Sequence, residues 1–195
     1  GEGHDVLNGG LGDDTLDGGF DNDMLDGGEG NDRIIGNDGD DSASGGEGND
    51  SVFGSDGADT VLGRDGDDLL RGGADNDRIF GDNGNDNLSG DGGDDNLFGG
   101  NGDDLLNGSA GNDTVSGGNG DDLATGDEGD DRVFGNDGED RLFGEAGDDM
   151  LRGGNNSDIL IDGQGTDVLR GDGGDDVIFA SGFMNEQAAI DLFKT

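Results

Sequence analysis

The feature that most constrains this chain is a period of nine residues. Aspartate recurs at every ninth position from residue 5 to residue 176 without a slip in phase. The twenty positions are occupied by Asp5, Asp14, Asp23, Asp32, Asp41, Asp50, Asp59, Asp68, Asp77, Asp86, Asp95, Asp104, Asp113, Asp122, Asp131, Asp140, Asp149, Asp158, Asp167 and Asp176. The repeating unit is G-(G/N/D/S)-x-G-(D/N)-D-x-(L/I/V)-x, and we number its positions one to nine, so that the recurrent aspartate is position six. A period held this strictly predicts a solenoid of stacked repeats.

Each repeat divides into a polar turn and a short strand. Glycines at positions one and four permit positive φ, so we expect positions one to six to form a tight turn. Positions seven to nine suffice for only a very short strand, with the aliphatic residue at position eight pointing inward. Two repeats then make the two sides of one coil of eighteen residues. The hexapeptide GGEGND, at 27–32 and again at 45–50, would lie above itself one coil later.

Composition shows that such a solenoid needs an outside source of stability. The 195 residues carry a formal net charge of −41 and include 48 glycines, and there is no cysteine for a disulfide or a thiolate metal site. Composition of this kind is by itself typical of a disordered chain, because little apolar surface can be buried and the charges repel one another. The unbroken period favours a fold instead, and bound cations are the obvious source of compensating charge.

The spacing places carboxylates where cations can bridge neighbouring coils. A hard divalent cation such as calcium prefers six to eight oxygen ligands, from carboxylates and carbonyls, and the acidic, glycine-rich turn offers both. Twenty turns that alternate between two sides give nine neighbouring pairs on each side and eighteen in all. Up to eighteen calcium ions would bring 36 positive charges and leave −5 of the −41.

The unit resembles the GGxGxDxUx nonapeptide of RTX (repeats-in-toxin) proteins, over about residues 1–179. The resemblance implies an all-β fold, a right-handed parallel β-roll of about ten coils, with calcium in its turns. It implies that the aspartates at position six, from Asp5 to Asp176, are carboxylate ligands and that backbone carbonyls supply the other ligands. It also implies an extracellular protein that a type I system secretes unfolded and that folds outside the cell when calcium binds.

Several positions depart from the repeat, and we expect the calcium sites beside them to be the weakest. Asp21, Asp75 and Asn156 replace the glycine at position four, and Asp162 replaces the glycine at position one. Arg64, at position two, puts a cation beside a predicted cation site. The small residues at position eight, which leave gaps in the aliphatic column, are Ala43 and Ala124.

We expect residues 1–179 to be the β-roll and residues 180–195 to be a capping tail. Asn185 can cap a short helix whose apolar side would cover the last coil. Because the chain begins inside a repeat, we also expect it to be a piece of a longer protein.

The outward sheet faces are candidate contact surfaces. At eighteen-residue spacing, one face should stack Leu62, Phe80 and Phe98, and the other should stack Phe143, Ile161 and Phe179. Seven of the eight arginines also fall at positions seven or nine, which point outward. Such patches bind a sister copy, a neighbouring domain or a polysaccharide, or they simply stabilise the sheets and keep them soluble.

Catalysis is not expected within these residues. His4 is the only histidine and occupies a polar turn position, and neither a zinc-protease helix nor an EF-hand loop is present. Nothing indicates nucleic-acid binding or a membrane span. The sequence therefore predicts a non-enzymatic structural or adhesive segment of a secreted surface, matrix or filament protein. The alternative is the calcium-triggered folding and secretion module of a larger RTX hydrolase or toxin.

Overall fold

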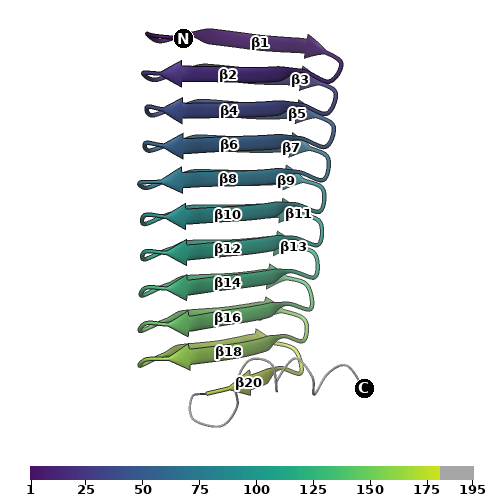
Figure 1. The fold of residues 1–195 in the computed structure, drawn as a ribbon. Coiled ribbons are helices and arrows are strands. Elements are labelled where there is room, and N and C mark those ends of the chain that lie inside the picture. The colour runs from purple at the N-terminus through teal and green to yellow at the C-terminus, as the bar shows by residue number, and fades with distance from the viewer. Residues whose placement is uncertain (181–195) are drawn as a thin grey trace.

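The computed structural model describes residues 1–180, which form one stack of short parallel strands (Figure 1). Nineteen strands have six residues and the last has three. Their bounds are β1 Val6–Leu11, β2 Thr15–Phe20, β3 Met24–Glu29, β4 Arg33–Asp38, β5 Ser42–Glu47, β6 Ser51–Asp56, β7 Thr60–Asp65, β8 Leu69–Ala74, β9 Arg78–Asn83, β10 Asn87–Gly92, β11 Asn96–Asn101, β12 Leu105–Ala110, β13 Thr114–Asn119, β14 Leu123–Glu128, β15 Arg132–Asp137, β16 Arg141–Ala146, β17 Met150–Asn155, β18 Ile159–Gln164, β19 Val168–Gly173 and β20 Val177–Phe179.

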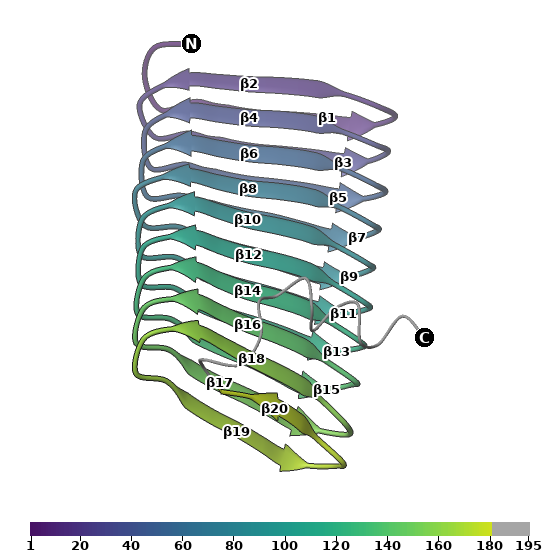
Figure 2. The same ribbon diagram turned by 60° about the horizontal axis from the view of Figure 1, so that its bottom comes forward.

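The strands form two ten-stranded parallel sheets. The odd-numbered strands, from β1 to β19, make one sheet, and the even-numbered strands, from β2 to β20, make the other (Figures 1 and 2). Each strand pairs with the strand two later in the chain, so Leu7 lies beside Leu25 and Phe80 beside Phe98. The register is eighteen residues throughout, which confirms the predicted coil and a parallel β-solenoid of about ten coils.

The core is a column of aliphatic side chains between the two sheets. Position eight points inward in every repeat from Leu16 to Leu160, and these side chains are at most 5% exposed. Ala43 and Ala124 are as fully buried as the larger side chains. Burial of one Leu or Val is worth roughly 1.5–3 kcal/mol, so the column stabilises the stack through many small and equal contributions.

The strands are longer than the sequence suggested. The prediction of three-residue strands was wrong, because each strand continues from position seven into position three of the following repeat. Position one is skipped in the pairing: Asp26 pairs with Ser44 and Gly28 with Gly46, whereas Gly27 has no register partner. One residue is left unpaired at this place in each of the two strands, so the ladder is interrupted at position one and resumes at position two in the same register. Hydrophobic periodicity does not reveal this interruption.

Positive φ occurs at positions two and four, whereas the sequence pointed to positions one and four. In the turn between β3 and β4, Gly28 has φ of 108° and Gly30 has φ of 134°. Where position two is not glycine, Asn, Asp, Ser, Glu or Arg adopts the same conformation, as Asp82 does at 73°. The glycine at position one has a different role, which becomes clear at the turn.

Residues 1–180 contain no helix, and so this part of the chain has no helix that could span a membrane. The helix that we expected in the tail 180–195 lies outside the described residues.

Candidate metal centres

All twenty aspartates at position six lie in the turns between the two sheets, in two rows of ten. The row in which each turn follows an odd-numbered strand contains Asp14, Asp32, Asp50, Asp68, Asp86, Asp104, Asp122, Asp140, Asp158 and Asp176. The row in which each turn precedes an odd-numbered strand contains Asp5, Asp23, Asp41, Asp59, Asp77, Asp95, Asp113, Asp131, Asp149 and Asp167. The structure therefore brings the sequence-predicted residues together within each row and separates the two rows by the width of the sheets.

In the eighteen aspartates from Asp23 to Asp176, one oxygen of the carboxylate is held by the preceding coil. The backbone N–H of Asp68 donates to Oδ1 of Asp86 at 2.8 Å, and the N–H of Asp86 donates to Oδ1 of Asp104 at 2.8 Å. The same bond recurs along both rows, from Asp5 to Asp176, at 2.7–3.0 Å. The carboxylates are thereby fixed in one orientation.

The second oxygen of the carboxylate has no partner. Among the described residues, Oδ2 is buried without a hydrogen bond in the eighteen aspartates from Asp14 to Asp167. Leaving one buried polar group unsatisfied costs about 1–3 kcal/mol, and more when the group is charged. Eighteen such oxygens in two rows are incompatible with a stable fold unless a cation neutralises them, so the residues fit a metal ion.

The glycine at position one makes room for this carboxylate. A Cβ built on Gly81 would lie 2.3 Å from Oδ2 of Asp86 and 2.5 Å from the carbonyl oxygen of Gly99, one coil later. Both contacts are far shorter than a real Cβ tolerates. The glycine is therefore required by the close approach of a carboxylate oxygen and a carbonyl oxygen, which face the same place, and not by its φ angle.

Burial also raises the pKa of many aspartates in the two rows. Burial raises the pKa of Asp68 to about 7, against a backbone hydrogen bond that lowers it, and the nearby carboxylates of Asp86 and Asp50 raise it further. Burial likewise raises the pKa of Asp113 to about 7 and that of Asp140 to about 6. Proton and metal ion therefore compete for the same oxygens.

The donor set is made of oxygen atoms. Among residues 1–180, no three acidic or histidine side chains converge on one point. A site between two coils can thus take at most two carboxylates, and the remaining ligands have to be backbone carbonyls of the glycine-rich turns. Oxygen-only coordination of this kind suits calcium rather than zinc or copper.

The turns that depart from the repeat keep the common geometry. Asp21 and Asn156 adopt φ of 69° and 75° at position four, and Oδ2 stays buried without a partner in Asp23 and Asp158. Asp162, at position one, is itself buried at 5% exposure. The expectation of weaker binding at these turns stays a prediction.

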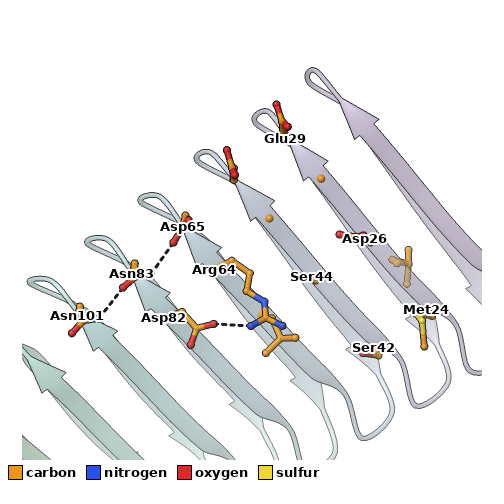
Figure 3. Close-up of a pocket in the computed structure, with 15 residues that line it drawn as sticks. Met24, Asp26, Glu29, Ser42, Ser44, Arg64, Asp65, Asp82, Asn83 and Asn101 are labelled. Atoms are coloured by element: carbon orange, nitrogen blue, oxygen red, sulfur yellow. Dashed lines mark hydrogen bonds and ion pairs between the residues drawn. The ribbon is translucent and has the colours of Figure 1, made fainter.

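Arg64 does not reach the metal row. Its guanidinium lies 3.4 Å from Oδ2 of Asp82, one coil later, and its side chain is 53% exposed. The pair lies on the outer surface (Figure 3).

Sequence reasoning missed the role of position five. The backbone N–H of Asp103 donates to Oδ1 of Asn85 at 2.8 Å, and that of Asp121 donates to Oδ1 of Asp103 at 2.9 Å. This second ladder runs opposite to that of position six, since here each N–H donates to the preceding coil. The preference for Asp or Asn at position five, visible in the repeat, was its signal.

A parallel β-solenoid whose turns carry two rows of buried, half-satisfied carboxylates is a cation-binding β-roll. A comparison with protein families matches the RTX calcium-binding nonapeptide repeat to nine overlapping segments, 1–34, 26–61, 35–70, 53–88, 62–97, 89–124, 116–151, 125–160 and 152–183. The chain belongs to this family, and its repeats bind calcium. A search of curated proteins found no match.

Proposed function

We propose that this chain is a non-enzymatic, extracellular calcium-binding β-roll that serves as a structural or adhesive segment of a secreted surface, matrix or filament protein. The observation that carries the proposal is the double row of buried Oδ2 atoms without partners. Without a cation, the buried negative charges of the two rows of aspartates oppose folding. With a cation bound between them, the aspartates of successive coils are joined. Folding is therefore coupled to calcium, which is scarce inside cells and abundant outside them.

The twenty aspartates at position six, from Asp5 to Asp176, are the proposed carboxylate ligands. Each ion would lie in the gap between two coils on one side, where a carboxylate oxygen and carbonyls of successive turns face one another. Eighteen gaps set the upper limit on the number of ions, and full occupancy would reduce the formal charge from −41 to −5. Calcium then supplies most of the charge compensation that the chain lacks.

A structural role fits the uniformity of the stack. Every coil repeats the same turn, the same inward aliphatic residue and the same register, so the described part of the chain repeats one site and does not build a single distinct centre. The stack lengthens by the same amount with each added coil, because each coil contacts only its neighbours. These are properties of a spacer or scaffold.

The test is a calcium titration of the chelator-stripped chain followed by far-ultraviolet circular dichroism. Calcium should convert a coil-like spectrum into a β spectrum cooperatively. Magnesium at equal concentration should do so poorly, because it demands octahedral geometry and dehydrates reluctantly. An equal response to both ions, or a β spectrum that persists in excess chelator at about pH 8, where the buried carboxylates are ionised, would contradict the proposal.

The same coupling between calcium and folding also supports the second candidate, a folding and secretion module of a larger RTX hydrolase or toxin. The two candidates differ in what the purified, calcium-loaded material does. Filaments or lattices in electron micrographs would favour the structural role, and a catalytic or pore-forming domain encoded in the same reading frame would favour the module.

A further inference from the structure

Asparagine is followed by glycine five times in this chain, and three of these dipeptides lie in one row. Asn83, Asn101 and Asn119 occupy position three at the ends of β9, β11 and β13, so they lie in the same turn of three successive coils. All three side chains are exposed to solvent. We call these three residues the amide row.

The side-chain amides of the amide row are joined from coil to coil. Nδ2 of Asn83 donates to Oδ1 of Asp65 at 2.7 Å, and Nδ2 of Asn101 donates to Oδ1 of Asn83 at 2.7 Å (Figure 3). Nδ2 of Asn119 donates to Oδ1 of Asn101 at 2.7 Å. Each amide is therefore held against the preceding coil, and its orientation is fixed.

The backbone nitrogen that follows each of these asparagines is held by the next coil. The N–H of Gly84 donates to the carbonyl oxygen of Asn101 at 2.9 Å, and the N–H of Gly102 donates to that of Asn119 at 2.8 Å. The N–H of Gly120 makes the same bond to the coil after it at 2.8 Å. The side-chain amide and the following nitrogen are thus both fixed by contacts between coils, and not by contacts within a repeat.

An Asn–Gly step in a flexible chain loses its amide without a catalyst. The backbone nitrogen of Gly attacks Cγ of the Asn side chain and closes a five-membered succinimide. Its proton passes through water to the side-chain nitrogen, which leaves as ammonia. Water then opens the ring at one of its two carbonyls, so that one amide and one water become one carboxylic acid and one ammonia. Glycine favours this reaction because it has no Cβ to shield the nitrogen and its backbone bends freely.

The stacked coils keep the two reacting groups apart. The N–H of Gly102 points at the next coil, and the amide of Asn101 is hydrogen-bonded to the preceding coil. For the attack, Gly102 has to give up this proton and Asn101 has to turn its amide toward Gly102. Water already reaches the exposed amide row, so restraint and not burial is what slows the reaction. The reaction therefore waits for the coils to open locally.

We propose that Asn83, Asn101 and Asn119 are deamidation sites of the metal-free chain, and that calcium protects them by keeping the hydrogen bonds between coils in place. The inference rests on the proposed function, because it requires that the coils are stacked when calcium is bound and separate when it is removed. The stacked chain keeps its amides, and the unstacked chain loses them at the rate of a flexible peptide.

Deamidation would add charge where carboxylates already lie on both sides of the amide row. Position three carries Glu29, Glu47 and Asp65 in the coils before the row, and Asp137 in the coil after it. Conversion of the three asparagines to aspartate would give seven successive carboxylates, one per coil. A carboxylate only accepts hydrogen bonds, so no Nδ2 would remain to join these side chains, and their repulsion would oppose stacking.

The second product, isoaspartate, would change the backbone itself. It forms when water opens the succinimide at the backbone carbonyl, and it adds one methylene to the main chain. In this turn the added atom would displace the glycine N–H from the carbonyl oxygen that it binds in the next coil. Time spent without calcium should therefore make refolding progressively harder.

The test is peptide mapping by mass spectrometry of two samples of the chain kept side by side at about pH 8, one in saturating calcium and one in excess chelator. Circular dichroism of the same samples records which of them is folded. Deamidation of the amide row should be at least about tenfold slower in calcium, since a coil that is open for less than about a tenth of the time reacts that much more slowly. In chelator the three sites should react as fast as short synthetic peptides of the same sequence.

Two outcomes of this comparison would overturn the inference, and they differ in what they say of the proposed function. Equal rates in the two samples, with a β spectrum in calcium, would overturn the inference and leave the proposed function standing. A coil-like spectrum in saturating calcium would contradict the proposed function, and the inference with it.

One variant separates the hydrogen bond of the amide from folding as such. Asn83→Ala removes the oxygen that accepts from Asn101 and leaves the Asn101–Gly102 step in place. In calcium, Asn101 should deamidate faster in this variant than in the unmodified chain, whereas Asn119, which is held by Asn101, should not. Asn87→Ala, at an exposed position on the even sheet, is the matched control and should leave the rate at Asn101 unchanged. The same rate at Asn101 in all three chains would overturn the proposal.

A further pair of variants tests the effect of the added charge on refolding. Aspartate at all three positions of the amide row imitates one product of the reaction. The calcium titration of this variant should have its midpoint at a higher calcium concentration than that of a control with the same added charge. The control places three aspartates on the sheets, where no carboxylate lies beside them in register, and its substitutions are Asn87→Asp, Asn96→Asp and Asn107→Asp. Equal midpoints would overturn the inference that deamidation opposes refolding.

Discussion

Asp104 accepts a hydrogen bond through Oδ1 from the backbone N–H of Asp86 at 2.8 Å, and its own Oδ2 is buried without a partner. The first contact joins two successive coils and fixes the carboxylate. The second oxygen is thereby held in place for a cation. One oxygen of this carboxylate therefore joins two coils, and the other remains available to a cation.

Paired substitutions along and across the rows should behave differently. Asp86→Asn with Asp104→Asn removes both carboxylates from one gap, whereas Asp86→Asn with Asp95→Asn leaves one carboxylate in every gap it touches. We expect the first pair to lose at least one bound calcium in isothermal titration calorimetry and to be less stable than the sum of its single variants predicts, since the two sites interact. Asn keeps the Oδ1 acceptor, so the effect reports charge.

The pair Asp86→Asn and Asp95→Asn is the control, because the losses of unfolding free energy from its two single variants should add. A larger loss of stability for this pair than for Asp86→Asn with Asp104→Asn would contradict the assignment of each row to one side of the stack.

Alanine at position one should damage a site directly. The Cβ of Gly81→Ala would lie 2.3 Å from Oδ2 of Asp86, and the crowding should lower the free energy of unfolding by about 1–3 kcal/mol. Gly92→Ala is the matched control, because a Cβ there meets nothing closer than 3.9 Å. Thermal unfolding in saturating calcium measures both. Equal effects would show that the close approach of Asp86 is not what requires glycine.

The position-five ladder should tolerate an exchange between Asp and Asn but not alanine. Asp103→Ala removes the acceptor of the Asp121 N–H and should cost about 1 kcal/mol of unfolding free energy. Asp103→Asn keeps that acceptor and should be close to neutral, as Asn85 and Asn49 already fill the same role. Urea unfolding in calcium compares the variants. A similar loss in both would mean that charge, not the hydrogen bond, matters at this position.

Acid should partly replace calcium. Burial raises the pKa of Asp59 and Asp77 from 3.8 to about 7, so the metal-free folded state binds more protons than the unfolded chain between these values. Stability of the metal-free fold is therefore greatest below the unfolded pKa and is lost as pH rises through the folded pKa. In chelator, circular dichroism should show more β structure at about pH 5 than at about pH 8.

The same competition should weaken calcium binding in acid. Affinity measured by titration should fall as pH decreases through about 7, because protons occupy the ligand oxygens. Light scattering separates refolding from aggregation near the sequence pI of 4.1. Affinity that is constant across this range would show that these carboxylates are not ligands.

The nine-residue period determined the fold class, the eighteen-residue coil, the inward position eight and the row of aspartates, because each of these depends only on which residues recur at which phase. The stacking of Phe80 on Phe98 followed from the same spacing and is confirmed by the register.

The features that only the tertiary structure decided are those that depend on contacts between neighbouring coils. Strand length, the interruption of pairing at position one and the positive φ of position two all arise where one backbone meets the next, as does the reason that Gly81 must be glycine. The sequence by itself names the residues that repeat, and the distance between neighbouring coils decides which oxygen is hydrogen-bonded and which is left for calcium.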